Sequence, residues 1–337
     1  MSGYNLTPEV VRLTIIVGVI LSIVFYERVQ LTTGGAIVPA YLALTVTRPI
    51  AVVVTVLAGY LTYVIVSSVI GRRRILYGRR KFEAEVLVGL GIIMTFTLSA
   101  HLLGRLDPVL LAFAGIGFLI PGIIAHDMGR QRPTRTLAAI AITTAILALF
   151  AYVVSSLLSL MPGASRAAAA VLSSRLGYPR ELLLIAVTLS VLVGMFVYTR
   201  LGLRSGGFIT GAYLALVSPR WADLLFTAVV AVLTWFVVVR ILMPRLLLFG
   251  RRKISTMLLV GAIVGWTTEL VLAVLTRQEY IPWLGLTVAT LMVPALIAND
   301  AERQGWNKTL WGTGLVGIGV FALTNLVAAP LEYGGVL

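Results

Sequence analysis

The chain has 337 residues, of which 59% are hydrophobic and only 12% are charged, and its mean hydropathy is +1.00. A soluble domain needs far more polar surface, so this composition excludes an ordinary soluble protein and predicts an all-α polytopic integral membrane protein. The formal net charge of +14 fits the excess of cations in the cytoplasmic loops of membrane proteins. A basic face could in addition meet an anionic partner, a substrate or a lipid headgroup.

Metal and cofactor chemistry has little support in this sequence. Cysteine is absent, which excludes disulfides, thiolate metal sites and cysteine nucleophiles, and His101 and His126 are the only histidines. No Gly-x-x-x-x-Gly-Lys-Ser/Thr loop for nucleotide phosphates occurs. We therefore expect no metal, no cofactor, no catalytic residue and no nucleic-acid partner.

Four apolar runs of the first half are long enough to cross the roughly 30 Å hydrocarbon core of a membrane as helices. They are residues 10–26, 50–70, 84–103 and 137–160. The first run is predicted to be an uncleaved span, because no small-residue cleavage site follows it.

Two further apolar segments of the first half are interrupted by glycine and proline. Residues 31–46 begin with Gly34-Gly35 and contain Pro39, which predicts either a broken or re-entrant helix lining a path or a proline-kinked span. Residues 109–125 are broken at Pro121.

The second half replays this order. Its spans are predicted at residues 181–198, 224–243, 257–275 and 310–328, with interrupted segments at 206–217, opened by Gly206-Gly207, and at 283–298, broken at Pro294. We therefore predict a first repeat at 1–160, a linker at 161–180 that forms a surface helix, and a second repeat at 181–337. Each repeat holds four firm spans and two interrupted segments.

Short polar motifs recur at a nearly constant offset, which shows that the chain is an internal duplication. Tyr77-Gly78-Arg79-Arg80-Lys81 recurs in the second half as Phe249-Gly250-Arg251-Arg252-Lys253. At almost the same interval, Asp127 and Arg130 recur as Asp300 and Arg303. If each half crosses the membrane an even number of times, both basic connectors lie in the cytoplasm, as cations prefer. We therefore predict parallel repeats, related by an axis along the membrane normal.

The first half resembles the membrane subunit of poly-γ-glutamate biosynthesis, the PgsC/CapC family, over roughly residues 10–158. The resemblance is carried, in order, by Glu27-Arg28, Gly35-Ala36-Ile37-Val38-Pro39-Ala40-Tyr41-Leu42, Ile75-Leu76-Tyr77-Gly78-Arg79-Arg80-Lys81-Phe82, and the stretch from Gly115 through Pro121-Gly122 to Arg130-Gln131. The second half is a degraded copy, with Thr199, Gly211 and Asn299 in place of Glu27, Pro39 and His126. The chain therefore looks like a tandem fusion of two family members.

The resemblance implies a role in a bacterial plasma-membrane complex. Such subunits work beside a soluble ATP-dependent amide ligase of the PgsB/CapB type and other synthase subunits, which implies a non-catalytic or co-catalytic role for this chain. It would hold or activate the ligase at the membrane, and could pass the polyanionic γ-glutamyl product outward. The alternative from the residues alone is a free-standing transporter or channel for an anionic solute. An oligomer is compatible with either function.

The candidate binding residues are the charged groups that recur in both halves. Arg79, Arg80, Lys81, Arg251, Arg252 and Lys253 could bind the γ-glutamyl chain or an acidic ligase surface through charge-assisted hydrogen bonds. The alternative is that these residues only set topology and contact lipid headgroups. Asp127 with Arg130, and Asp300 with Arg303, could form local ion pairs or a polar ring at a pathway mouth or docking face.

One carboxylate stands inside a predicted span. Glu269 has Thr97 as its counterpart in the first half, so this acid is not part of the repeated pattern. An acid within a membrane span is expected to serve function unless it reaches the interface.

Overall fold

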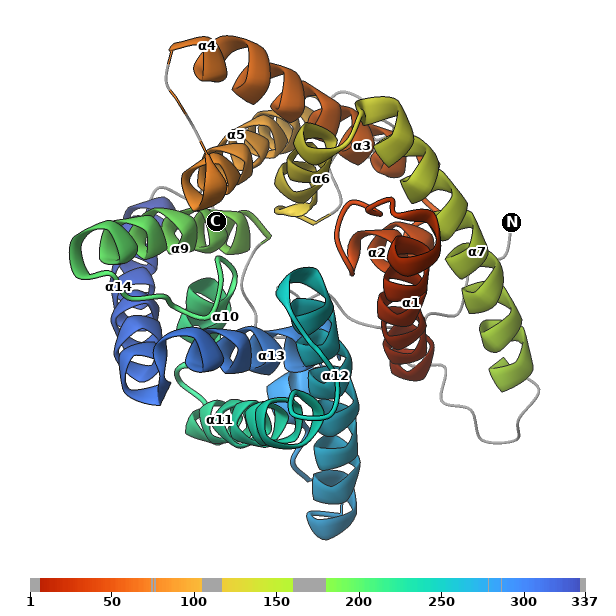
Figure 1. Cartoon of the computed structure of the whole chain (residues 1–337). Helices are drawn as coiled ribbons and strands as arrows, with labels where there is room; N and C mark the ends of the chain where they lie inside the picture. Colours follow the sequence, from red (N-terminus) through yellow and green to blue (C-terminus); the bar gives the residue numbers. More distant parts are fainter. Residues whose placement is uncertain are drawn as a thin grey trace. The chain divides into compact units, whose positions relative to one another are not determined.

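The computed structural model describes residues 7–73, 75, 77–104, 117–159, 180–277, 279–285 and 287–333, and every structural statement below concerns these residues. The chain divides into two compact units, Met1–Ala168 and Ala169–Leu337 (Figure 1). In the first unit the helices are α1 (Pro8–Val29), α2 (Val38–Leu44), α3 (Pro49–Val64) continued by η1 (Ile65–Ile70) and α4 (Gly71–Arg73), α5 (Gly78–Gly104), α6 (Ile120–Arg130) and α7 (Pro133–Ser159).

The second unit repeats this helix order. Its helices are α9 (Arg180–Leu201), α10 (Thr210–Val217), α11 (Trp221–Trp235) continued by η3 (Phe236–Leu242), α12 (Gly250–Leu275), η4 (Pro282–Gly285), α13 (Thr287–Gln304) and α14 (Trp306–Tyr333). Even the π-helical turns η1 and η3, which continue the third helix of each unit, recur at matching places. The predicted surface helix of the linker falls almost wholly on residues outside those described.

Seven helices in the described parts of the chain are long and apolar enough to cross a membrane, so the chain is a multi-pass membrane protein. They are Pro8–Val29, Pro49–Arg73, Pro133–Leu158, Leu182–Leu201, Trp221–Leu242, Gly250–Leu275 and Trp306–Ala329. The predicted span 84–103 falls within α5, which takes the place in the first unit that α12 has in the second. These long helices expose large apolar side chains such as Val53, Leu149 and Leu233, as lipid-facing helices do.

The first interrupted segment of each unit is an irregular stretch followed by a short helix. Gly34 and Gly35 have φ of 76° and 105°, and Gly206 and Gly207 have φ of 77° and 94°, a conformation that strongly favours glycine. The chain then turns into α2 or α10, of seven and eight residues. Because Pro39 lies in the first turn of α2, where its missing N–H costs nothing, this segment is a broken element and not a proline-kinked span.

The expected interruption at Pro294 is absent. Pro121 lies in the first turn of α6, yet its counterpart Pro294 lies inside α13, which continues from Thr287 to Gln304. A proline inside a helix removes one backbone hydrogen bond and tends to kink it, but packing against neighbouring helices tolerates that loss in a membrane protein. Pro294 is therefore a position of local distortion and not a helix break.

The short helices lie inside their units, where close backbone contacts hold them. In the first unit α6 packs against α3, α5 and α7 (Figure 1). A Cβ atom on Gly122 of α6 would lie 2.7 Å from the Cα atom of Val86, and one on Gly89 would lie 2.8 Å from the Gly122 nitrogen. In the second unit the matching crossing brings Gly261 of α12 against Ala295 of α13. Small residues at these crossings let the two backbones approach, as is common between membrane helices.

The contacts fix the direction of every helix within its own unit. We call the end at which α5 or α12 begins the basic end. In the first unit α1 ends there, because Thr32 contacts Gln131 at the end of α6, and α7 starts there. Since α3 is continued to Arg73 near the start of α5, it begins at the opposite end, and residues 30–48 must travel between the two ends. In the first unit α1 therefore begins, and α7 ends, at the end opposite the basic end. The number of membrane crossings and the parallel repeats stay predictions.

Candidate functional site

A glutamine amide holds the irregular stretch after α1 at the basic end of the first unit. Gln131 Nε2 donates to the Thr32 carbonyl at 2.7 Å, and the Thr32 amide donates to Gln131 Oε1 at 2.9 Å. Gln131 Nε2 also donates to Thr136 Oγ1 in the first turn of α7 at 2.9 Å. The Gln131 side chain thus provides hydrogen-bond partners for the amide and the carbonyl of Thr32, which lies outside any helix. It also links the segment after α1 to the end of α6 and the start of α7.

The second unit carries the same arrangement. Gln304 binds the backbone of Arg204 with distances of 2.8 and 2.9 Å and donates to Thr309 Oγ1 at 3.0 Å. Asp300 Oδ2 accepts a hydrogen bond from the Gly206 amide at 3.0 Å, and its other oxygen lies 3.8 Å from Arg204 Nη1. The carboxylate of Asp300 therefore satisfies the backbone at the paired glycines. Its counterpart Asp127 is likewise buried, with 1% of its surface exposed.

The basic connector of the first unit is anchored by two acids on its own helix. Arg79 Nε donates to Glu83 Oε1 at 2.7 Å, and Lys81 Nζ lies 3.8 Å from Glu85 Oε1. Glu85, 1% exposed, also contacts α6 because its Oε2 lies 2.7 Å from His126 Nδ1. The centroid of the Phe82 ring lies 4.7 Å from that of the same histidine. Arg80 is exposed.

The connector of the second unit uses an acid from a different helix. Met257 takes the place of Glu85 and is buried, and Lys253 instead donates to Glu302 of α13. Glu302 occupies the position of Gly129, which lies beside the Lys81 ammonium in the first unit: a Cβ atom on Gly129 would be 2.8 Å from Lys81 Nζ. The carboxylate partner of the lysine has thus moved from α5 to α13 between the two copies. Arg252 is exposed like Arg80.

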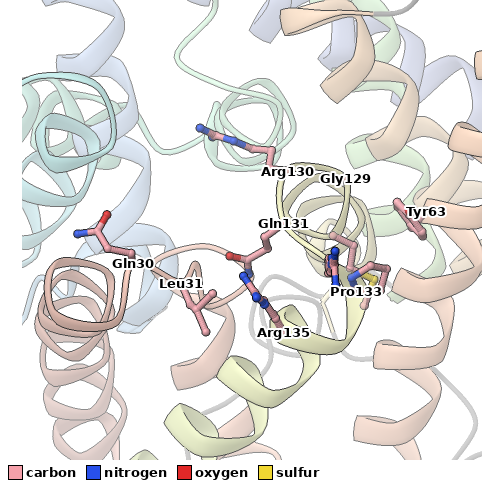
Figure 2. Close-up of a pocket in the computed structure, with 10 residues that line it drawn as sticks. Gln30, Leu31, Tyr63, Gly129, Arg130, Gln131, Pro133 and Arg135 are labelled. Atoms are coloured by element: carbon pink, nitrogen blue, oxygen red, sulfur yellow. The ribbon is translucent and has the colours of Figure 1, made fainter.

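An open pocket of about 500 Å³ lies at the basic end of the first unit. The end of α1 and the loop after it contribute Gln30 and Leu31, α3 contributes Tyr63, and the turn between α6 and α7 contributes the remaining wall (Figure 2). That wall includes Arg130, Arg132 and Arg135, all of which are exposed. None of the residues lining the pocket is acidic.

A different polar cluster closes the opposite end of the second unit. Asp223, fully buried at the start of α11, accepts hydrogen bonds from the Tyr280 hydroxyl at 2.6 Å and the Trp283 amide at 3.0 Å, and lies 3.3 Å from Arg220 Nη1. Trp283 Nε1 donates to Thr227 Oγ1 at 3.0 Å. Burial and the hydrogen bond to Asp223 raise the pKa of Tyr280 above that of a free tyrosine. This cluster holds the loop between α12 and α13 against α11.

The predicted candidate residues occupy two kinds of environment. The cations of the connectors lie on or near the surface of the basic end, and Arg130 and Arg303 are exposed there too. Asp127 and Asp300 are buried, so their carboxylates lie inside each unit. Glu269 of α12 is buried, with 8% of its surface exposed, and therefore does not reach solvent freely. The binding roles assigned to these residues remain predictions.

Four features were not predicted from the sequence: the two glutamine clamps, the Glu85–His126 contact, the lysine partner on α13, and the Asp223 cluster. For the glutamines a signal was present, because Gln131 and Gln304 follow the repeated aspartates at the same spacing in both halves. The Asp223 cluster had no such signal, since Ala51 stands at the matching position of the first half.

Comparison with known proteins agrees with the duplication seen in the structure. The family described as "Capsule biosynthesis CapC" matches residues 17–137 and again residues 189–310. The starts of the two matches are as far apart as Tyr77 and Phe249, and their ends are as far apart as Asp127 and Asp300. The chain belongs to the CapC family. It contains two tandem copies of the family domain, so the family predicted from the connectors and glycine motifs is confirmed.

Curated members of the CapC family match about one unit's length of this chain. The capsule biosynthesis protein CapC of Bacillus anthracis is 37% identical over 119 residues, which are 35% of this chain and 78% of that protein. The PGA biosynthesis protein CapC of Bacillus subtilis (strain 168) is 37% identical over 125 residues, which are 37% of this chain and 81% of that protein. No solved structure matches the chain. The chain is thus a membrane protein of a family that takes part in capsule biosynthesis.

Proposed function

We propose that this chain is the integral membrane subunit of a poly-γ-glutamate synthase complex. It anchors or activates a soluble ATP-dependent amide ligase at the cytoplasmic face of the plasma membrane and guides the polyanionic product. The observation that carries the proposal is the double CapC match on two units that each present a basic connector at one end. The relative in Bacillus subtilis is a PGA biosynthesis protein, which supplies the polymer class.

The charge of the basic end supports contact with an acidic partner or product. Exposed cations there include Arg80, Arg130, Arg132 and Arg135 in the first unit and Arg252 and Arg303 in the second. Guanidinium groups bind carboxylates through paired hydrogen bonds, so a polymer with one carboxylate per residue, or an acidic ligase surface, suits them. Arg79, Lys81 and Lys253 already pair with acids of this chain. The exposed arginines are therefore the better candidates for binding an acidic partner or product.

The interrupted segments favour this function over a free-standing channel. In a channel, unwound backbone groups commonly face a water-filled path and coordinate the solute. Here the Gln131 and Gln304 amides and the Asp300 carboxylate bind backbone groups of the unwound stretches. Buried threonines of the long helices, such as Thr55 and Thr234, donate to carbonyls of their own helix. Polar backbone groups of the broken segments are therefore bound by side chains of the same unit.

Reconstitution distinguishes the two functions. The purified chain in liposomes should not move glutamate or short γ-glutamyl peptides on its own, whereas liposomes carrying the chain should recruit the soluble ligase and increase its polymer yield. Exchange of Arg80 and Arg252 for lysine preserves the charge that sets topology but removes bidentate recognition, and should lower ligase recruitment. Rapid anion flux without any ligase would instead establish the transporter.

A further inference from the structure

The two units differ at the turn that precedes their last helix. In the first unit this turn forms the open pocket, with Tyr63 of α3 and Pro133, the first residue of α7, on its rim. Three arginines line it, and within the described chain no carboxylate pairs with any of them. Figure 2 shows Arg130, Gln131 and Arg135 around the turn, with Gln30 and Leu31 coming from the end of α1.

In the second unit two tryptophans occupy the matching rim positions. Trp235 stands where the first unit has Tyr63, and Trp306 stands where it has Pro133. Their rings meet edge to face with centroids 5.9 Å apart, and the Arg240 guanidinium lies 5.6 Å from the Trp235 centroid. Two indoles, in contact with each other and with a guanidinium, therefore stand where the first unit has a phenol ring and a proline ring.

The turn of the second unit also carries less positive charge than the turn of the first. In the second unit Gly305 stands in place of Arg132, and Glu302 stands in place of Gly129. Glu302 accepts a hydrogen bond from Lys253. The first unit thus presents three arginines and no acid at this turn, whereas the second presents Arg303, Lys308 and one acid. Nearby, Asn299 has replaced His126, and its buried side-chain oxygen finds no donor among the described residues. Both steric and electrostatic changes remove the features that would bind an anion.

We infer that the first unit binds a carboxylate-bearing chain at this pocket, and that the matching turn of the second unit is a closed structural copy. This inference rests on the proposed function for the identity of the chain, a γ-linked glutamyl oligomer. Guanidinium groups can each bind a carboxylate with two hydrogen bonds. Three arginines within six residues offer guanidinium groups to more than one carboxylate of a flexible polymer.

The decisive experiment compares two variants that remove equal charge. The full chain, in nanodiscs of neutral phosphatidylcholine, is titrated with a fluorescent γ-linked pentaglutamate. Arg132→Gln with Arg135→Gln should weaken binding about tenfold, since both substitutions remove charge-assisted hydrogen bonds that solvent partly screens at these exposed side chains. Arg245→Gln with Lys308→Gln removes the same charge from exposed positions of the second unit and should change binding less than about twofold. Equal losses in both variants would overturn the inference.

A steric variant tests the pocket without removing charge. Tyr63→Trp with Pro133→Trp gives the first unit the indole pair of the second, and should abolish pentaglutamate binding while leaving the thermal unfolding midpoint of the chain unchanged. Retained binding in this folded variant would contradict the inference. A competition arm with phosphatidylglycerol nanodiscs tests the other anion source. If anionic lipid displaces the peptide completely and free pentaglutamate does not displace the lipid, the ligand is a headgroup and the inference is wrong.

The outcome for the pocket is separable from the outcome for the proposed function. Loss of peptide binding only in the variants of the first unit supports the pocket even if no ligase associates with the chain. Conversely, the ligase could require this chain while peptide binding does not change in the Arg132 and Arg135 variant. That result would support the proposed function and contradict the inference about the pocket.

Discussion

Gln131 and Thr32, 99 residues apart, are joined by a pair of hydrogen bonds between one side-chain amide and one backbone, and Gln304 and Arg204 repeat the pair in the second unit. The clamp explains how a chain of this kind tolerates a stretch without helix next to the membrane interior. Gln131 after α6 binds the backbone of Thr32, and Gln304 at the end of α13 binds that of Arg204. Asp300 of α13 also accepts a hydrogen bond from the Gly206 amide.

Removal of this clamp should destabilise the unit that contains it. Gln131→Ala leaves the Thr32 amide and carbonyl without partners, and an unsatisfied buried polar group costs about 1–3 kcal/mol. We expect the unfolding midpoint in detergent, followed by tryptophan fluorescence, to fall by several degrees, with a similar fall for Gln304→Ala. The exposed Arg303→Ala serves as the control and should leave the midpoint unchanged. An unchanged midpoint for Gln131→Ala would show that the clamp carries no stability.

The Lys253–Glu302 pair should behave as a coupled unit. Both side chains are largely buried, so Glu302→Gln or Lys253→Met alone leaves a charge without its partner and should cost about 1.5–3 kcal/mol. The double variant should cost less than the sum of the two single variants. A double-mutant cycle of denaturant unfolding in detergent measures this coupling energy. A coupling energy near zero would mean that solvent screens the pair.

Two glycines on α5 provide a matched pair for the helix crossing. Gly89→Ala places a methyl group 2.8 Å from the Gly122 nitrogen of α6 and should destabilise the fold by about 1–3 kcal/mol through overpacking. At Gly91 no atom of another element lies within 4 Å of the place that a methyl group would take, so Gly91→Ala should be neutral or stabilising by about 0.5–1 kcal/mol because alanine favours the helix. Thermal unfolding of the two variants gives the comparison. Equal effects would exclude the close crossing.

The Asp223 cluster should make stability depend on alkaline pH. The pKa of Tyr280 is raised by burial and by its hydrogen bond to Asp223, so the folded state keeps the phenolic proton at pH values where the unfolded state loses it. The contribution of Tyr280 to stability is therefore fully present below the ordinary tyrosine pKa of about 10 and decreases as pH rises beyond it. Tyr280→Phe should be less stable than the parent chain at neutral pH and lose less stability between about pH 9 and pH 11. Spectrophotometric titration at the tyrosinate band, compared between the two proteins, checks the assignment, and identical titrations would contradict it.

The repeat, the family and the helix order could be predicted from the sequence because they depend on local features. Glycine pairs and basic connectors recur at a constant offset in the same order, which indicates the repeat. The lengths of the apolar runs indicate the membrane spans. Even the anchoring of Arg79 and Lys81 was within reach, since Glu83 and Glu85 lie one helical turn away from them.

The features that escaped prediction depend on long-range contacts or on packing. His126 reaches Glu85 across 41 residues, and Lys253 reaches Glu302 across 49, distances over which neither charge pattern nor helical spacing is informative. Pro294 was expected to break its segment as Pro121 does. Packing around α13 lets the helix continue through it, and no sequence pattern distinguishes the two prolines.

The central claim, that the chain is the membrane subunit of a poly-γ-glutamate synthase, is tested most directly by purifying the tagged chain in mild detergent and assaying the eluate for polymer synthesis dependent on ATP and glutamate. The account predicts that a soluble ligase co-purifies, and that polymer formation stops when this chain is omitted and returns when it is added back. A ligase that makes polymer equally well without the chain, or an eluate with neither ligase nor polymer, would contradict the claim.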